Sequence, residues 1–151
     1  MAKLKYPPLR QFIVSAGISY GIATLTPDLV FRIPFSPLLA ISLALVGIIL
    51  LISAVGLFAK FNTTVNPMEP NKASSLVTNG LYNYTRNPMY LGLLLCLIAF
   101  VVWLQNPAAI LGIVLFVITM TIFQIIPEEK VMSDKFGKEY EDYKARVRRW
   151  L

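Results

Sequence analysis

The stretch NPMYLGLLLCLIAFVVWLQNPAAILGIVLFVITMTIFQIIP, residues 87–127, is 41 residues long and carries no charge. A membrane-spanning helix needs about 20 apolar residues, so this stretch is too long for one crossing and suits two. Gln105-Asn106-Pro107 interrupts it with a polar turn that is closed by a proline. We therefore predict a helical hairpin over residues 88–126, with helices at 88–104 and 108–126.

The composition of the whole chain agrees with a membrane protein. Of its 151 residues, 56% are hydrophobic and only 15% are charged, whereas soluble domains carry about 25% charged residues. The chain has no histidine, which excludes histidine metal ligands and histidine acid–base catalysis, and no metal site is expected. The single cysteine, Cys96, lies inside an apolar run and excludes a disulfide within the chain.

Two further apolar runs precede the hairpin. Residues 38–59 form 22 uncharged positions, which is enough for one crossing, and residues 11–27 form 17, which is close to the lower limit. We predict an all-α membrane protein with four transmembrane helices in a single domain. Residues 1–59 would be a two-helix scaffold, and residues 60–151, with the hairpin and a tail at 128–151, would hold nearly all the polar chemistry.

The placement of positive charge supports four crossings. Four crossings put thirteen of the fourteen lysines and arginines on one side, and three or five crossings would scatter them. Arg32 is the exception, and the thirteen are Lys3, Lys5, Arg10, Lys60, Lys72, Arg86, Lys130, Lys135, Lys138, Lys144, Arg146, Arg148 and Arg149. The positive-inside rule makes that side cytoplasmic, with both termini inside. The net charge of +6 is thus mainly a topology signal, and nucleic acid is not an expected partner.

Alternatives remain for both ends of the chain. Lys3 and Lys5 before an apolar stretch resemble a signal peptide, but no convincing small-residue cleavage site follows. In the tail, aromatic and apolar residues recur at spacings of four and three, which predicts an amphipathic helix. These residues are Phe136, Tyr140, Tyr143, Val147 and Trp150. The helix would lie on the membrane surface, fold over a site as a lid, or do both.

Charged residues flank the hairpin at both of its ends. Arg86 precedes it and Glu128 and Glu129 follow it, so a hairpin brings them to one membrane face. Ionisable groups at that depth are costly unless they are paired or functional. Consecutive helical residues point about 100° apart, so one glutamate would meet Arg86 while the other faces a ligand. A purely structural salt bridge that closes the hairpin is the alternative.

Tyrosines surround this cluster. Tyr82, Tyr84 and Tyr90 flank Arg86, and Tyr140 and Tyr143 are within reach from the tail. Interfacial tyrosines are commonly membrane-anchoring residues. Together with an arginine, an asparagine and two acids, they would form a pocket suited to a ligand with a flat ring, a ribose and a zwitterionic end.

At these residues the chain resembles the isoprenylcysteine carboxyl methyltransferases and the related phospholipid methyltransferases. The match is GLYNYTRNPMYLG at residues 80–92 and, after the hairpin, PEEKVMSDKFGKEYEDYKARVRRW at residues 127–150. The family pattern is approximately Gly-x-Tyr-x-x-x-Arg-His-Pro-x-Tyr-x-Gly, followed by Glu-Glu and Phe-Gly-x-x-Tyr-x-x-Tyr. The resemblance covers about 70 residues, and the order and spacing of its motifs make it specific.

The resemblance implies an integral membrane methyltransferase that uses S-adenosyl-L-methionine, bound at the cytoplasmic rim. Arg86 and Glu129 are the candidate catalytic residues. The cofactor site that it implies consists of Tyr82, Arg86, Asn87, Pro88, Tyr90, Gly92, Gln124, Glu128 and Glu129. Asn87 replaces the family's histidine, and Gln124 stands where many relatives carry an arginine. These two differences bear on the identity of the methyl acceptor more than on the identity of the cofactor.

Methyl transfer from a sulfonium needs alignment and exclusion of water more than it needs a covalent nucleophile. Because the chain has no histidine, a carboxylate, thiolate or neutral acceptor is favoured over an ammonium, which must first lose a proton. The expected acceptor is hydrophobic and membrane-partitioned, such as an isoprenylcysteine-like carboxylate or a related lipid. A sterol-reductase-like NADPH enzyme and a non-catalytic membrane protein are the two alternatives.

Overall fold

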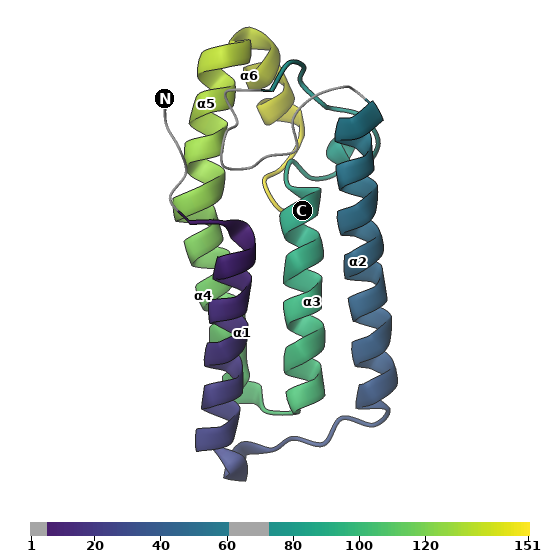
Figure 1. Ribbon diagram of the computed structural model, residues 1–151, viewed down its shortest axis with the longest axis vertical. Coiled ribbons are helices and arrows are strands. Elements are labelled where there is room, and N and C mark those ends of the chain that lie inside the picture. Colours follow the sequence, from purple (N-terminus) through teal and green to yellow (C-terminus); the bar gives the residue numbers. More distant parts are fainter. Residues whose placement is uncertain (1–5, 61–72) are drawn as a thin grey trace.

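Four long helical segments lie side by side in the computed structural model, which describes residues 6–60 and 73–151 (Figure 1). The first three are α1 (Pro8–Leu25), α2 (Ser36–Lys60) and α3 (Pro88–Leu104). The fourth is a continuous rod of α4 (Ile110–Met120), a π-helical segment (Thr121–Ile125) and α5 (Ile126–Phe136), after which α6 (Lys138–Arg146) folds back. No β-strand occurs in the described part of the chain, so the predicted all-α class is confirmed.

Local sequence explains where the predicted hairpin turns. Gln105 takes a left-handed conformation with φ of 51°, which ends α3. The side chain of Asn106 then accepts a hydrogen bond from the Ala108 backbone N–H at 2.9 Å, and Pro107 follows as the first residue of a short 3-10 turn, Pro107–Ala109. Proline at the first helical position loses no hydrogen bond and has a helical φ already.

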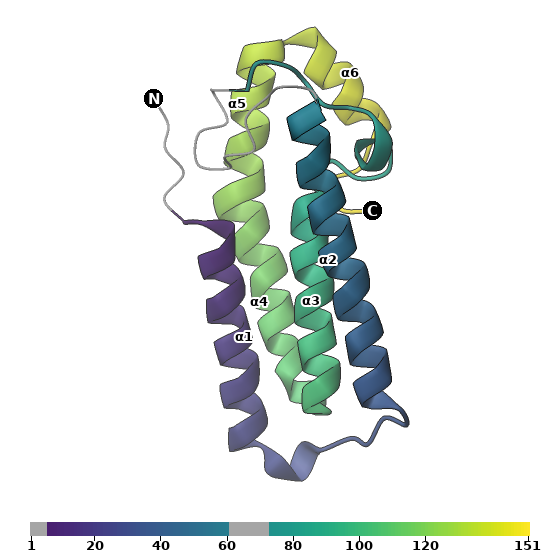
Figure 2. The ribbon, with the colours of Figure 1, turned by 45° about the vertical axis from the view of Figure 1, so that its right-hand side comes forward.

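Helix α3 is at the centre of the arrangement. Helix α2 packs along α3, while α1 packs against α4 and α3 (Figure 2). The α2–α3 contact is close because Gly47 faces Gly92, where an added Cβ on Gly92 would lie 2.6 Å from the Gly47 carbonyl oxygen. The α1–α4 contact uses Gly112 against Ser19, whose hydroxyl donates to the Ala109 carbonyl at 2.9 Å.

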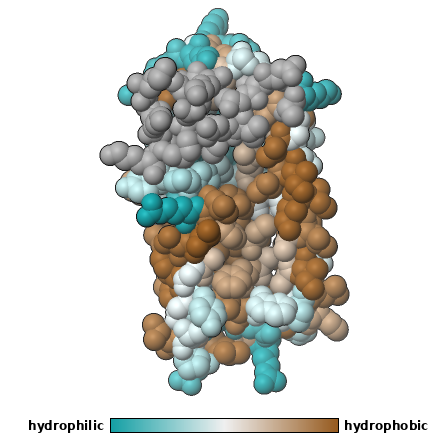
Figure 3. All heavy atoms as spheres, viewed as in Figure 1, coloured by the Kyte–Doolittle hydropathy of each residue, from teal (hydrophilic) through white to brown (hydrophobic). Residues whose placement is uncertain are grey.

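The surface of the helices is apolar over most of their length. Apolar side chains cover the middle of the molecule, and hydrophilic ones gather toward its two ends (Figure 3). Two helical stretches among the described residues, Ser36–Phe58 and Pro107–Phe136, are long and apolar enough to cross a membrane, and α3 is a shorter apolar helix. Many large apolar side chains of α2 are exposed; an apolar surface of this extent marks contact with a membrane or a partner.

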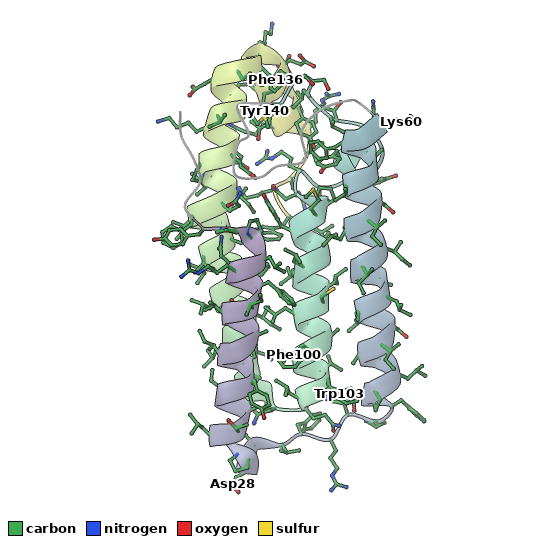
Figure 4. The ribbon with its side chains drawn as sticks, in the orientation of Figure 1. Asp28, Lys60, Phe100, Trp103, Phe136 and Tyr140 are labelled. Atoms are coloured by element: carbon green, nitrogen blue, oxygen red, sulfur yellow. The ribbon has the colours of Figure 1, made fainter. Side chains whose placement is uncertain are left out.

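Charged residues mark opposite ends of the bundle. Asp28 lies at one end, and Lys60 lies at the other end, which also holds Phe136 and Tyr140 (Figure 4). Arg86 lies at the Lys60 end as well, because its side chain donates to the backbone of Lys144 in α6. Lys3, Lys5 and Lys72, which contributed to the predicted topology, fall outside the described residues, as does most of the 60–80 connection.

The tail differs from the single helix predicted over residues 128–151. The rod continues past the predicted end at residue 126 as far as Phe136, and Gly137, with φ of 53°, separates α5 from α6. Helix α6 ends at Arg146, and Val147 is extended. Tyr140 and Tyr143 are buried within the protein, so these two rings of the predicted aromatic face pack against other segments of the chain. The periodicity grouped these two tyrosines on one helical face but carried no signal for the break at the glycine.

Candidate functional site

A partly open cavity of about 110 Å³ lies at the Lys60 end of the bundle, and α6 borders it through Tyr140 and Tyr143. Six segments of the chain contribute to its wall: the end of α2, residues 73–77, the loop that leads into α3, the first turn of α3, the rod around α5, and α6. The lining residues are Phe58, Ala73, Ser75, Leu76, Val77, Tyr82, Arg86, Asn87, Met89, Tyr90, Ile125, Glu128, Glu129, Met132, Tyr140 and Tyr143.

The fold brings most of the predicted site residues to this one cavity. Six of them line it, namely Tyr82, Arg86, Asn87, Tyr90, Glu128 and Glu129. The other three, Pro88, Gly92 and Gln124, are not among the lining residues. Pro88 is the first residue of α3, and Gly92 packs against α2. Gln124 is fully buried and contacts lining residues from outside the cavity.

Glu129 is held by two arginines. The Arg86 Nη2 atom donates to Glu129 Oε1 at 2.7 Å, and the two side chains are only 9% and 11% exposed. Arg149 donates through Nε to Oε1 at 3.0 Å and through Nη2 to Oε2 at 2.8 Å. Planar two-point contacts of this kind are among the stronger charge-assisted hydrogen bonds. Both oxygens of Glu129 are therefore engaged by cations.

Arg86 also connects the cavity wall to the end of α6. Its Nη1 atom donates to the carbonyls of Lys144 at 2.8 Å and Val147 at 3.0 Å. Its backbone N–H donates to the Arg148 carbonyl at 3.0 Å. The Nε atom is buried and has no hydrogen-bond partner in the described part of the structure. Most donors of Arg86 are thus used within the protein.

Glu128 differs from its neighbour because it is bonded only to neutral groups. The Tyr90 hydroxyl donates to Glu128 Oε1 at 2.8 Å, and Gln124 Nε2 donates to the same oxygen at 2.9 Å. Gln124 Nε2 also lies 3.2 Å from the Tyr90 hydroxyl oxygen. Residues 6–60 and 73–151 supply no ion-pair partner for Glu128. Its carboxylate is therefore the acidic group of the cavity wall that is left available to a ligand.

Local sequence sets the direction of the two glutamates. Pro127 cannot donate a backbone hydrogen bond, and its ring clashes with the carbonyl of the fourth preceding residue. The π-helical segment Thr121–Ile125 ends two residues before this proline, and the Ile126 N–H donates to the Thr121 carbonyl five residues back. Such wider turns are frequent at functional sites. Glu128 and Glu129 begin the next helical turn and diverge, one toward Tyr90 and one toward the arginines.

Buried tyrosines form the wall on the α6 side. The Tyr143 hydroxyl donates to the Tyr82 carbonyl at 2.8 Å, which joins α6 to the loop before α3. Phe58 meets Tyr82 edge-to-face, with ring centroids 5.5 Å apart. Burial raises the pKa of Tyr82, Tyr140 and Tyr143 well above the ordinary value. These phenols remain neutral near pH 7 and do not supply a base.

Arg149 bonds a residue of the cavity wall, although its sequence position predicts only a tail cation that contributes to membrane topology. The sequence signal for a second cation was the pair of adjacent acids. A buried Glu129 that bonds one arginine through one oxygen still has a second carboxylate oxygen without a partner. The cation that completes the pair lies 20 residues away, beyond α6, so sequence spacing alone did not identify it.

Comparison with known proteins identifies a matching family and several similar proteins. The family model described as phospholipid methyltransferase matches residues 35–139. An uncharacterized protein of Haemophilus influenzae is 51% identical over 63 residues, which cover 42% of this chain and all of that protein. No solved structure matches the chain significantly.

Two relatives have descriptive names. A protein-S-isoprenylcysteine O-methyltransferase of Rattus norvegicus is 31% identical over an alignment that covers 92% of this chain and 53% of the relative. A protein of the same description from Dictyostelium discoideum is 39% identical over 72 residues, which cover 48% of this chain and 30% of the relative. The chain therefore spans about half, or less, of the length of these named relatives.

Proposed function

The chain belongs to the phospholipid methyltransferase family, and on that premise we propose that it transfers a methyl group from S-adenosyl-L-methionine to a hydrophobic acceptor in the membrane. The relatives with descriptive names are methyltransferases of isoprenylcysteine. An isoprenylcysteine-like carboxylate, or a related lipid, is the acceptor class that we propose for this chain.

One observation carries the proposal: the Glu128 carboxylate lies in the wall of an aromatic-lined cavity and is bonded only to Tyr90 and Gln124. A partly buried carboxylate without a cation is costly unless a ligand uses it. The cofactor offers ribose hydroxyls, an ammonium and a sulfonium, all of which a carboxylate binds. The unpartnered Arg86 Nε and the aromatic lining also suit a ligand with polar groups and a flat ring.

Each wall residue has a specific role in this proposal. Glu128 accepts hydrogen bonds from the cofactor, and Tyr90 orients Glu128. Glu129 and Arg86, expected to be catalytic, hold the walls together, because their charged groups are bonded to each other and to the tail. When bound, the cofactor supplies an electrophilic methyl group on sulfur. Tyr140 and Tyr143 of α6 form one side of the cavity, and the walls would hold donor and acceptor in line for the transfer.

The side chains of the cavity favour an acceptor that needs no deprotonation. Tyr82, Tyr140 and Tyr143 remain neutral, and Asn87 cannot take up a proton near pH 7. The Asn87 amide already donates to the Arg149 carbonyl at 2.9 Å. A carboxylate oxygen takes the methyl group directly and releases no proton. An amine acceptor would need Glu128 as its base and would compete with the cofactor for that carboxylate.

The arrangement in the membrane that we propose has four crossings, by α1, α2, α3 and the rod of α4 and α5, with the cavity and both termini on the cytoplasmic side. The concentration of lysines and arginines at the cavity end supports this orientation. Helices α1 and α2 lie on different sides of α3 (Figures 1 and 2). The apolar tail of the acceptor would reach the site from the bilayer beside these two helices.

Calorimetric titration with S-adenosylhomocysteine tests the cofactor. Glu128→Gln is the informative variant because its amide oxygen can still accept from Tyr90 while the charge is removed. Tyr84→Phe is the control, since Tyr84 belongs to the same motif but is 76% exposed and does not line the cavity. We expect saturable binding by the wild type and Tyr84→Phe, and binding weakened at least about tenfold in Glu128→Gln.

Failure of the well-folded wild type to bind would remove the cofactor proposal. Binding of NADPH in its place would favour the reductase-like alternative. Where the wild type binds, transfer of a labelled methyl group to a farnesylated cysteine in lipid vesicles tests the acceptor, with a phospholipid amine as the competing substrate.

A non-catalytic function is the second candidate, and the bonding of Arg86 favours it. Four donated hydrogen bonds join this residue to the carbonyls of α6 and the tail and to Glu129. A residue bonded in this way stabilises the fold whether or not a ligand binds. Arg86→Ala is expected to impair folding under either function, so variants of Arg86 do not discriminate between them.

A further inference from the structure

We propose that Arg149 is a positioning residue for the cavity, because it bonds one wall through its side chain and a second wall through its backbone. Arg149 does not line the cavity itself. The part of this proposal that concerns ligand affinity rests on the proposed function, whereas the part that concerns the tail does not.

The side chain of Arg149 holds the α5 wall. Its Nε and Nη2 atoms donate to the two oxygens of Glu129 at 3.0 and 2.8 Å. The hydrogen bond to Glu129 is the main cause that raises the pKa of Arg149 above its ordinary value, so the pair stays ionised across physiological pH. Arg86 bonds only Oε1 of Glu129, whereas Arg149 bonds both oxygens and therefore restricts the rotation of the carboxylate about its final bond.

The backbone of Arg149 holds the wall that leads into α3. Its carbonyl accepts from Asn87 Nδ2 at 2.9 Å and from Thr85 Oγ1 at 3.2 Å. Thr85 Oγ1 in turn accepts from the Asn87 backbone N–H at 3.2 Å. Asn87 lines the cavity, so the position of its amide depends directly on the place of this one carbonyl.

The next residue fixes the tail at a third point. Trp150 Nε1 donates to Thr121 Oγ1 at 3.2 Å, at the first residue of the π-helical segment. The indole also packs against the buried cluster that contains Tyr90 and Ile125, which both line the cavity. Arg149 and Trp150 therefore connect α5, the start of α3 and the π-helical segment after α6 has ended.

The chain supplies a matched control beside Arg149. Arg148 carries the same charge, is exposed, and has no side-chain hydrogen bond or ion pair within residues 6–60 and 73–151. Its backbone carbonyl, which accepts from Arg86, is unaffected by truncation of the side chain. Arg148→Ala and Arg149→Ala thus remove the same charge from adjacent positions, and only one of them breaks the bridge.

The experiment uses the natural fluorescence of the tail. The chain has two tryptophans, Trp103 and Trp150, and Trp103 is 57% exposed in the half of α3 away from the cavity (Figure 4). In full-length Trp103→Phe protein, Trp150 is then the single reporter of tail position. Arg148→Ala, Arg149→Ala and Arg149→Lys are made in this background, and emission and S-adenosylhomocysteine affinity are measured in the same detergent.

We expect Arg149→Ala to shift Trp150 emission to longer wavelength and to weaken the ligand by about tenfold or more, since misplacement by about 1 Å is costly at such sites. Arg149→Lys, which keeps the charge but loses the two-point contact, should fall between the wild type and Arg149→Ala. Arg148→Ala should match the wild type in both measurements. The alkylation rate of Cys96, between α2 and α3, should be the same in all variants and shows that the bundle remains folded.

Equal behaviour of Arg149→Ala and Arg148→Ala would overturn the proposal. A shift in emission with unchanged ligand affinity would also overturn it, because the tail would then be attached without positioning the cavity. If the wild type does not bind the ligand, the proposed function fails, and the attachment of the tail by Arg149 is decided by Trp150 emission alone.

Discussion

Gly92 gives the clearest test of whether a motif glycine serves the ligand or the fold. The resemblance placed Gly92 in the cofactor site, whereas the structure places it against α2. A Cβ added at Gly92 would lie 2.6 Å from the Gly47 carbonyl oxygen and 3.1 Å from both the backbone N and the Cβ of Leu51. These neighbours include the backbone of α2, which cannot rotate away, so Gly92→Ala must push α2 and α3 apart.

The magnitude follows from two opposing effects. Overpacking of a tightly packed contact costs about 1–3 kcal/mol, and the backbone contact favours the upper half of that range. Replacing glycine by alanine inside a helix stabilises the helix by about 1 kcal/mol. We expect a net loss of about 1–2 kcal/mol, which lowers the thermal midpoint by about 2–8 °C for a chain of this size.

Cys96 provides the assay because it is the single cysteine of the chain and lies at the same interface. Its Sγ atom is 3.9 Å from the Ala44 carbonyl of α2, so a thiol-reactive dye reports when α2 and α3 separate on heating. Gly56→Ala is the control, since a Cβ at Gly56, also in α2, would meet nothing within 4 Å. Gly56→Ala should leave the midpoint unchanged or raise it.

The opposite pattern would refute this reasoning. If Gly92→Ala keeps the wild-type midpoint and loses affinity for S-adenosylhomocysteine, Gly92 belongs to the ligand site as the motif implied. If Gly56→Ala lowers the midpoint as much as Gly92→Ala, the effect does not come from the close contact between the helices.

Three further predictions concern single hydrogen bonds and ionisation. Tyr143→Phe removes the donor to the buried Tyr82 carbonyl and should lower the free energy of unfolding by about 1–3 kcal/mol, measured by denaturant unfolding in detergent. An unchanged free energy of unfolding would show that another group satisfies this carbonyl. Asn106→Ala removes the hydrogen bonds to Thr26 and the cap at Ala108, and should lower the thermal midpoint more than Thr24→Ala, whose hydroxyl is bonded only within α1. Burial raises the pKa of Tyr82, Tyr140 and Tyr143 in the folded state, so the unfolded chain loses these protons first, at about pH 10. The free energy of unfolding should therefore be level below that pH and fall above it. A thermal midpoint that rises from pH 9 to 11 would contradict the burial of these phenols.

Several features could be predicted from the sequence because their causes are local. The length of the uncharged run and the turn at Gln105-Asn106-Pro107 fix a helical hairpin, and α3 begins and ends at the predicted residues. The helical periodicity of the tail identified Tyr140 and Tyr143 as one face. The divergence of Glu128 and Glu129 followed from the 100° step of a helix, and the structure shows the two in different hydrogen-bond networks.

Other features could not be predicted from the sequence, because they depend on which distant segments of the chain come into contact. Nothing local distinguishes Arg149 from Arg148, and only the packing of the tail against α5 gives one of them a carboxylate. The roles of Gly92 and Gln124 likewise depend on α2 and Tyr90, which are remote in sequence. Hydropathy and helical periodicity are properties of consecutive residues and therefore determined the class of protein and the hairpin. The pairing of charges depends on distances of a few ångströms between separate segments, and only the tertiary structure decided it.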